Sequence, residues 1–128
     1  MTSRDYCQLM AERGRLLALF DGAMPVGYLT YHLCPTVEST LSYIQRDMRL
    51  PPLLDYPEGS IIYIEQLEGL AWSRPLLRQV RELLTQRHPN WTKGIWYRLH
   101  RGQWTRHTLC REGGYYVSHV FSPCCLAV

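Results

Sequence analysis

A run of four apolar residues, Ile61 to Ile64, stands near the middle of the chain. The run is β-branched and aromatic, it is too short for a helix, and Pro57 and Gly59 precede it, so it predicts a buried strand. Glu65 follows at once. A carboxylate at the end of an apolar strand costs free energy unless it is paired or used in chemistry. Glu65 is therefore the first candidate for a functional side chain.

An amphipathic helix is expected after this strand. Ser73 is a candidate N-cap, and Pro75 in the first turn loses no hydrogen bond that the helix needs. One face of the helix is apolar, with Leu76, Leu77, Val80, Leu83 and Leu84. The opposite face is basic, with Arg74, Arg78 and Arg81. The turn before the helix contains Gly69, and a helix N-terminus reached in this way can bind an anionic group through its backbone amides.

A hairpin and a helix are predicted before the central strand. Residues 15–20 and 26–33 are two strand-like runs, and the Asp21-Gly22 pair between them favours a hairpin turn. A short helix is expected over residues 3–13. After the hairpin, Thr36 is a candidate N-cap for a second helix. The apolar face of that helix is expected to consist of Val37, Leu41, Ile44 and Met48.

Three more strands are predicted after the basic helix, which ends at residues 88–90. The strand-like runs cover residues 94–100, 104–110 and 115–121. Short turns at Arg101-Gly102-Gln103 and Gly113-Gly114 join them into an antiparallel meander.

The predicted elements follow the order hairpin, helix, strand, helix, meander. This order predicts a single α+β (mixed α/β) domain over residues 1–128, built on one central twisted, mostly antiparallel sheet flanked by helices. Residues 122–128 are expected to form a short flexible tail. Its adjacent cysteines, Cys124 and Cys125, are most simply exposed thiols, although the last four residues also satisfy a C-terminal prenylation pattern.

Composition narrows the function classes. The chain has 128 residues, of which 46% are hydrophobic and 20% charged, as in an ordinary globular domain, and its formal net charge is +3. So small a charge favours acidic or phosphate-bearing partners only mildly. The chain has no long apolar run and its first residues include charges, so a cytoplasmic protein without a membrane span is expected. Five cysteines without a C-x-x-C spacing indicate reduced thiols.

The order of elements resembles the acetyltransferase-type fold of the GNAT superfamily, in which the pyrophosphate of the acyl donor lies on a helix N-terminus. The stretch from Leu67 to Ser73 stands where that superfamily has an Arg/Gln-x-x-Gly-x-Gly/Ala loop, and it contains one glycine, Gly69. The resemblance implies a GNAT-like single domain with no tightly bound cofactor, in which acyl-coenzyme A is the less expected donor.

A narrower resemblance is to the RTX toxin-activating lysine acyltransferases, the haemolysin-activating proteins. From about Leu16 to Tyr116 the chain is similar to that family in the order and spacing of short motifs. These are Met24-Pro25-Val26-Gly27-Tyr28, Tyr63-Ile64-Glu65, Arg87-His88-Pro89 and Arg111-Glu112-Gly113-Gly114. The resemblance implies a bacterial, cytoplasmic enzyme of protein acylation, which transfers a fatty acyl group from acyl carrier protein to a lysine of a protein substrate.

This resemblance also implies a catalytic pair, an aspartate on the central strand and a histidine upstream of the first hairpin. Glu65 stands at the aspartate position and is one methylene longer. No histidine precedes His32, so the expected histidine is missing. Either His32 or another histidine replaces it, or the protein has kept the fold and lost or changed the reaction. The alternation along its strand predicts that the His32 side chain faces outward. The alternative interpretation of Glu65 is an ion pair with Arg98 or Arg106 of a neighbouring strand.

The acyl donor or its carrier is expected to bind at Gly69, Ser73, Arg74, Arg78 and Arg81. Arginines complement the acidic surface of an acyl carrier protein, so the basic helix face is a candidate docking surface. The alternative is a solvated helix face on which Glu82 pairs locally with Arg78.

Two other function classes stay open. A non-catalytic binding module on the same fold, encoded for example by a mobile genetic element, would act by protein contact alone. Trp91, Trp96 and Trp104 with interleaved arginines would instead stack on single-stranded nucleic acid, although a charge of +3 makes this the weaker interpretation. His100 and His107 are expected on a solvated polar face, and the histidine spacing predicts no metal site. The sequence leaves the oligomeric state open.

Overall fold

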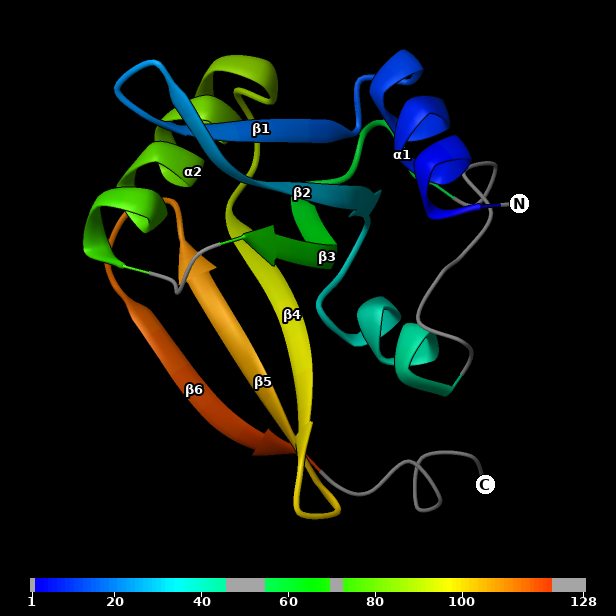
Figure 1. The fold of residues 1–128 in the computed structure, drawn as a ribbon. Helices are drawn as coiled ribbons and strands as arrows, with labels where there is room; N and C mark the ends of the chain where they lie inside the picture. Colours follow the sequence, from blue (N-terminus) through cyan, green and yellow to red (C-terminus); the bar gives the residue numbers. More distant parts are fainter. Residues whose placement is uncertain (1, 46–54, 70–72, 121–128) are drawn as a thin grey trace.

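The computed structural model describes residues 2–45, 55–69 and 73–120. These residues form one six-stranded sheet whose strands follow chain order, from β1 to β6 (Figure 1). The strands are β1 (Leu16–Asp21), β2 (Met24–Cys34), β3 (Ile61–Gly69), β4 (Lys93–His100), β5 (Gln103–Cys110) and β6 (Tyr115–Val120). The helices are α1 (Ser3–Glu12), the 3-10 helix η1 (Glu38–Gln45) and α2 (Arg74–Arg87).

The sheet is mixed and mostly antiparallel. Every described pair of neighbouring strands is antiparallel except β3 and β4, which run parallel. Parallel strands need a crossover connection, and α2 provides it. The predicted α+β class, the mostly antiparallel sheet and the central place of the Ile61 strand are therefore confirmed.

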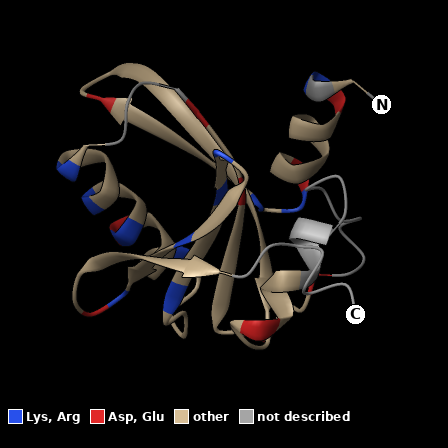
Figure 2. Ribbon diagram, turned by 90° about the horizontal axis from the view of Figure 1, so that it is seen from below, with Lys and Arg blue, Asp and Glu red and all other residues tan. Residues whose placement is uncertain are grey.

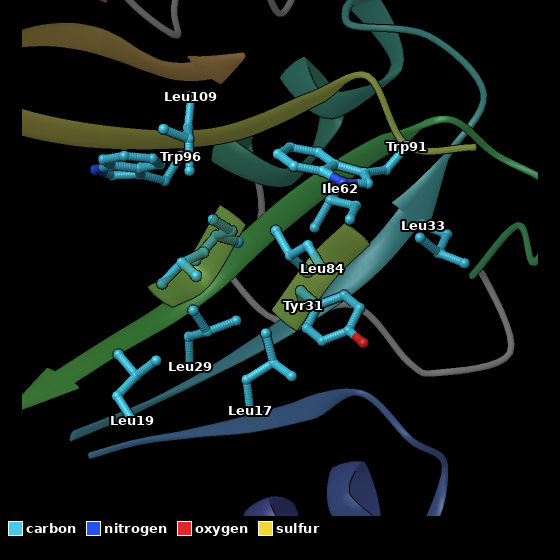
Figure 3. Close-up of a cluster of buried hydrophobic side chains, with 12 residues drawn as sticks. Leu17, Leu19, Leu29, Tyr31, Leu33, Ile62, Leu84, Trp91, Trp96 and Leu109 are labelled. Carbon is cyan, nitrogen blue, oxygen red and sulfur yellow. The ribbon is translucent and has the colours of Figure 1, made fainter. Parts of the chain in front are cut away.

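α2 packs on one face of the sheet. Its N-terminus is capped as predicted, because the Ser73 hydroxyl accepts a hydrogen bond from the Leu76 N–H. Val80 and Leu84 are buried against Ile62 and Ile64 of β3 in the cluster shown in Figure 3. The predicted apolar face of this helix is thus confirmed, with its centre at Val80 and Leu84.

η1 and α1 lie on the other side of the sheet from α2 (Figures 1 and 2). Here the alternate residues of β3, Ile61 and Tyr63, form a second buried cluster, and Val37 and Leu41 pack against it. We call this side the η1 face and the opposite side the α2 face. A strand buried on both faces is the centre of the sheet, as its apolar run predicts.

η1 is a 3-10 helix, whereas the apolar spacing predicts an α-helix. Ser39 Oγ donates to the Thr36 carbonyl at 2.6 Å, and Thr40 Oγ1 donates to the Val37 carbonyl at 2.6 Å. These hydroxyls bond to carbonyls three residues back and compete with the α-helical pattern. The side chain of Ile44, and the whole of Met48, lie outside the part of the chain that the structure describes.

β3 is longer than the sequence predicts. It continues to Gly69, so Glu65 lies inside the strand and not at its end, and Gly69 belongs to the strand and not to the turn. Residues 70–72 and the predicted tail, residues 122–128, lie outside the described ranges. Within those ranges, no helix has the length and apolar character needed to cross a bilayer.

The tryptophans of the meander belong mainly to the core. Trp91 is 1% exposed and Trp96 is 5% exposed, both in the cluster on the α2 face (Figure 3). Trp104 is half-buried. The expectation that nucleic-acid bases stack on Trp91 and Trp96 is therefore wrong, because both rings are already covered by protein.

Candidate functional site

A β-bulge positions the first predicted site residue. In the pairing of β2 with β3, Tyr31 lies opposite Ile64 and Thr30 lies opposite Gln66, so Glu65 is an extra residue in β3. The Thr30 hydroxyl lies 3.3 Å from Glu65 Oε1 and 3.1 Å from Gln66 Oε1. The bulge therefore turns two consecutive side chains to the η1 face. Bulges re-aim side chains in this way and are frequent beside active sites.

His32 on β2 meets Glu65 at this bulge. Its Nε2 lies 3.1 Å from Glu65 Oε2, and the two side chains are 0% and 1% exposed. His32 is opposite Tyr63 in the strand register, and Tyr63 belongs to the cluster on the η1 face. The structure thus brings together the two residues that the sequence offers as a catalytic pair, in a place closed to solvent.

The two sequence expectations about the surroundings of this pair are wrong. His32 does not face outward, because β2 is buried on both faces from Leu29 to Cys34. A strand covered on both sides does not follow the alternation of a half-exposed strand. The partner of Glu65 is His32 and not an arginine of β4 or β5. Arg98 is exposed, and Arg106 donates to a tyrosine hydroxyl of β4.

Tyr63 is another fully buried polar side chain on the η1 face. Burial, together with the negative charge of Glu65, raises the pKa of the Tyr63 hydroxyl well above its usual range, so this hydroxyl stays protonated at neutral pH. Nearby, the hydroxyls of Tyr97 and Thr40 lie 2.7 Å apart. The ring of Tyr97 lies beside that of Tyr63, with centroids 6.3 Å apart, so these polar side chains share the buried cluster on the η1 face.

The contact lies where the sheet opens. β3 pairs with β4 over only three residues, from Ile61 to Tyr63, and the two strands then separate (Figure 1). Glu65 follows Tyr63 by two positions, on the part of β3 that β4 no longer covers. The carboxyl ends of parallel strands in open sheets are the common place for ligands. The buried contact of His32 with Glu65 therefore lies beside the place where β3 and β4 separate.

No protein-family model matches this chain, and no curated protein matches it either.

Two of the predicted donor-binding residues, Ser73 and Arg74, lie at the start of α2. Ser73 and Arg74 are exposed, and a cavity of about 260 Å³ opens beside them. The cavity is lined by Phe20, Asp21, Val26, Ser73, Pro75, Leu76 and Gln79. Its walls come from the β1–β2 hairpin and the first turns of α2, on the face of the sheet opposite to His32 and Glu65. Gly69 ends β3, opposite Gly27.

The three predicted arginines separate into two groups. Arg74 and Arg78 are exposed on the outer side of α2, where Figure 2 shows basic positions. Arg81 is half-buried, and its guanidinium donates to the carbonyls of Cys110 and Gly113, each at 3.0 Å. The basic face available to a partner therefore consists of Arg74 and Arg78, while Arg81 joins α2 to the turn between β5 and β6.

A second polar network was not foreseen from the sequence. Arg15 binds both carboxylate oxygens of Asp55, at 3.2 and 2.9 Å, and Asp55 also accepts the Leu33 N–H at 2.6 Å. The Tyr31 hydroxyl lies 2.6 Å from His88 Nε2 at the end of α2. These groups are far apart in the chain, so no local pattern indicates them. They attach the segment at Asp55 and the end of α2 to the sheet.

The histidines of the meander differ from one another. His100 is exposed as predicted, whereas His107 is stacked against Trp96 with ring centroids 5.2 Å apart. Burial, with the positive charge of Arg98, lowers the pKa of His107. Among the described residues, no group of three histidine, cysteine or acidic side chains is arranged to hold a metal ion.

Proposed function

We propose that this protein is a lysine N-acyltransferase that takes its acyl group from acyl carrier protein. The observation that supports the proposal best is the contact of His32 with Glu65 at 3.1 Å, at a bulge beside the separation of β3 and β4. Acyltransferase chemistry needs a base near the attacking amine and a place for the acyl donor. The candidate base is the buried pair on the η1 face, and the candidate donor site is the cavity at the start of α2 on the α2 face.

The pair matches the proton chemistry of the reaction. A lysine must lose a proton before it attacks a thioester, although its free pKa is about 10.4. In the proposed mechanism His32 accepts that proton, and Glu65 orients the imidazole and stabilises its charged form. Attack of the amine on the thioester carbonyl forms the amide and releases the thiol of the carrier arm. Because both side chains are closed to solvent, the side chains that cover them have to move before a lysine can reach His32.

The carrier is proposed to dock on the start of α2. Acyl carrier proteins are acidic, and Arg74 and Arg78 are exposed there. The cavity of about 260 Å³ beside Ser73 is smaller than typical ligand pockets of about 300–1,000 Å³, so it suits the end of a carrier arm better than a whole nucleotide. The single glycine of the preceding stretch also disfavours a pyrophosphate, and coenzyme A is the weaker donor in this proposal.

Binding to the carrier tests the docking surface. We expect acyl carrier protein to bind with an affinity that falls as salt is added, because charges are screened over about 8 Å at physiological ionic strength. Reversing both Arg74 and Arg78 to glutamate should remove this binding. Reversing Arg13, which is exposed beyond the end of α1, should leave it unchanged. Equal loss in both variants would show that net charge, and not this surface, attracts the carrier.

Intact-mass analysis tests the reaction itself. The purified protein and candidate partner proteins are incubated with a long-chain acyl carrier protein and, separately, with the corresponding acyl-coenzyme A. The proposal predicts an acyl mass increase with the carrier donor that survives hydroxylamine and is therefore an amide. An acyl mass increase with acyl-coenzyme A but not with acyl carrier protein would show that acyl carrier protein is not the donor.

The closed burial of His32 and Glu65 favours one alternative, a non-catalytic binding module of the same fold. In that case the pair would serve only to hold β2 and β3 together, and no donor would give an acyl product. Glu65→Gln would then leave partner binding unchanged. Transfer and partner binding, measured on the same samples, separate the two functions.

A further inference from the structure

The fold closes one edge of its sheet with side chains of α2. At the β1 edge, the Gln79 amide accepts from the Phe20 N–H and donates to the Phe20 carbonyl, both at 2.8 Å. Arg87 donates to the Leu16 carbonyl at 2.8 Å. Backbone groups that would otherwise be open to another strand are therefore already bonded. Protection of this kind is how natural proteins prevent edge-to-edge association.

β6 forms the other edge of the sheet, and contacts with β5, α2 and β4 hold it in place. It pairs regularly with β5 over six residue pairs. Arg81 holds the turn before it through the carbonyls of Cys110 and Gly113. The ring of Tyr115 stacks on Trp96, with centroids 5.6 Å apart, and its hydroxyl bonds to His107. These contacts hold the strand in an extended conformation before it meets any partner, which lowers the entropy cost of pairing.

The sequence of β6 carries none of the usual protection of an edge strand. The strand reads Tyr-Tyr-Val-Ser-His-Val, without lysine, acidic residues or proline. Tyr115, Tyr116 and Val117 are 42%, 48% and 50% exposed. Because consecutive residues point to opposite faces, apolar side chains are exposed on both sides of this strand.

The hydrogen bonds of the hairpin show which backbone groups point outward. The Cys110 N–H donates to the Gly114 carbonyl at 3.0 Å, so Cys110 and Gly114 form a hydrogen-bonded pair. Antiparallel pairs alternate between bonded and non-bonded. In β6, Tyr116 and Ser118 therefore bond to β5, and Tyr115, Val117 and His119 direct their N–H and carbonyl groups away from the sheet.

We propose that β6 is a self-association edge, through which two copies of this chain pair antiparallel and continue the sheet. A two-fold axis perpendicular to the sheet keeps the α2 faces of the two copies on the same side. The axis passes beside Val117, so Val117 of one copy lies opposite Val117 of the other. Tyr115 then lies opposite His119 of the second copy. A second copy is the favoured partner because its edge is equally extended and carries no acidic or basic residue except His119. The antiparallel arrangement also keeps the charged turns, at Arg111 and Glu112, at opposite ends.

Introducing a positive or a negative charge at Val117, beside the two-fold axis, tests this arrangement. Sedimentation velocity from about 1 µM to 1 mM should show a monomer–dimer equilibrium for the unchanged protein. Val117→Lys and Val117→Glu should each be monomeric, because like charges opposite each other disfavour strand pairing. An equimolar mixture of the two should dimerise again. Met24→Lys, at a position 66% exposed on the other hairpin, should dimerise like the unchanged protein.

Two results would overturn the proposal. One is an unchanged protein that stays monomeric over the whole range, which would leave the edge to an extended segment of a different protein. The other is a mixture of the two charged variants that does not associate while the unchanged protein does. Amide exchange of the unchanged protein gives an independent reading without any substitution. The amides of Val117 and His119 should exchange more slowly as concentration rises, and rates independent of concentration would contradict the pairing.

Discussion

Gly59 is a residue at which the fold leaves no room for a side chain. A Cβ there would lie 2.6 Å from the carbonyl carbon of Cys34 and 2.9 Å from its amide nitrogen. These are backbone atoms of a buried strand, so they cannot move aside cheaply. The glycine therefore permits the returning chain to pass directly over the end of β2.

Gly59→Ala should accordingly lower the free energy of unfolding by about 1–3 kcal/mol, the usual cost of overpacking. Gly114→Ala is the matched control, because nothing lies within 4 Å of a Cβ at that position. It should change the free energy of unfolding by no more than about 0.5 kcal/mol. Urea unfolding of the two variants measures the difference. Equal midpoints would contradict the close approach to Cys34.

At the same scale, Glu65 and His32 show how far a sequence identifies a site. Each was identifiable as a candidate from its residue type and place, but their contact depends on the bulge. A signal of the bulge is present in the chain. In a regular strand, residues two apart lie on the same face, so Leu67 would lie on the face opposite to Ile62 and Ile64. An apolar residue at that position indicates an inserted residue in the strand. The network of Arg15 with Asp55 has no such local signal, since the two residues lie forty positions apart.

Among the elements, α2 shows that neighbouring arginines on one helix face can have different functions. Arg78 is exposed, whereas Arg81 bonds to two carbonyls at the β5–β6 turn. Arg81→Ala should lower the free energy of unfolding by about 1–3 kcal/mol, because hydrogen bonds from a charged group are lost. Arg78→Ala should change it by less than about 0.5 kcal/mol. Thermal unfolding compares the two, and a similar effect of both would contradict the anchoring function of Arg81.

The end of α2 makes stability depend on pH. Burial, with the positive charges of Arg15 and Arg87, lowers the pKa of His88 below its usual value of 6.5. The unfolded chain therefore binds a proton at a higher pH than the folded chain. The stability due to neutral His88 is complete above about pH 6.5 and is lost as the pH falls below it towards the folded pKa.

Urea midpoints at about pH 7.5 and pH 5.5 measure this effect. The midpoint should fall with acidification, and His88→Gln, which keeps a polar group near Tyr31, should reduce the fall. Part of the fall should persist in that variant, because His107 also has a lowered pKa. An identical fall in the two proteins would show that His88 does not contribute.

Most elements could be predicted because local signals mark them. The Asp21-Gly22 turn, the Ser73 cap and the glycine turns of the meander place the boundaries of their elements within a few residues of those observed. η1 was mistaken for an α-helix because apolar spacing does not show how Ser39 and Thr40 use their hydroxyls. The length of β3 was underestimated, since polar residues beyond Ile64 read as the end of a strand.

For the whole molecule, burial of β2 on both faces is the property that the sequence did not reveal. His32 lies on β2 among residues that alternate like a half-exposed strand, yet the sheet is covered by α2 on one face and by η1 on the other. Such covering depends on how distant elements pack, so it follows from tertiary structure and not from periodicity. It also places the candidate catalytic pair in the interior and the basic residues Arg74 and Arg78 on the surface.

The rate of acyl transfer by Glu65→Gln tests the central claim most directly. Glutamine keeps the shape and can still bond to His32 and Thr30, while it removes the charge that stabilises a protonated imidazole. The account predicts a folded variant whose transfer from acyl carrier protein is slower by about 10²–10⁴-fold. Gly114→Ala, changed in the β5–β6 turn where nothing lies within 4 Å of an added Cβ, should retain its rate. Equal rates for Glu65→Gln and the unchanged protein, or no transfer by the unchanged protein with any carrier-bound chain, would contradict the account.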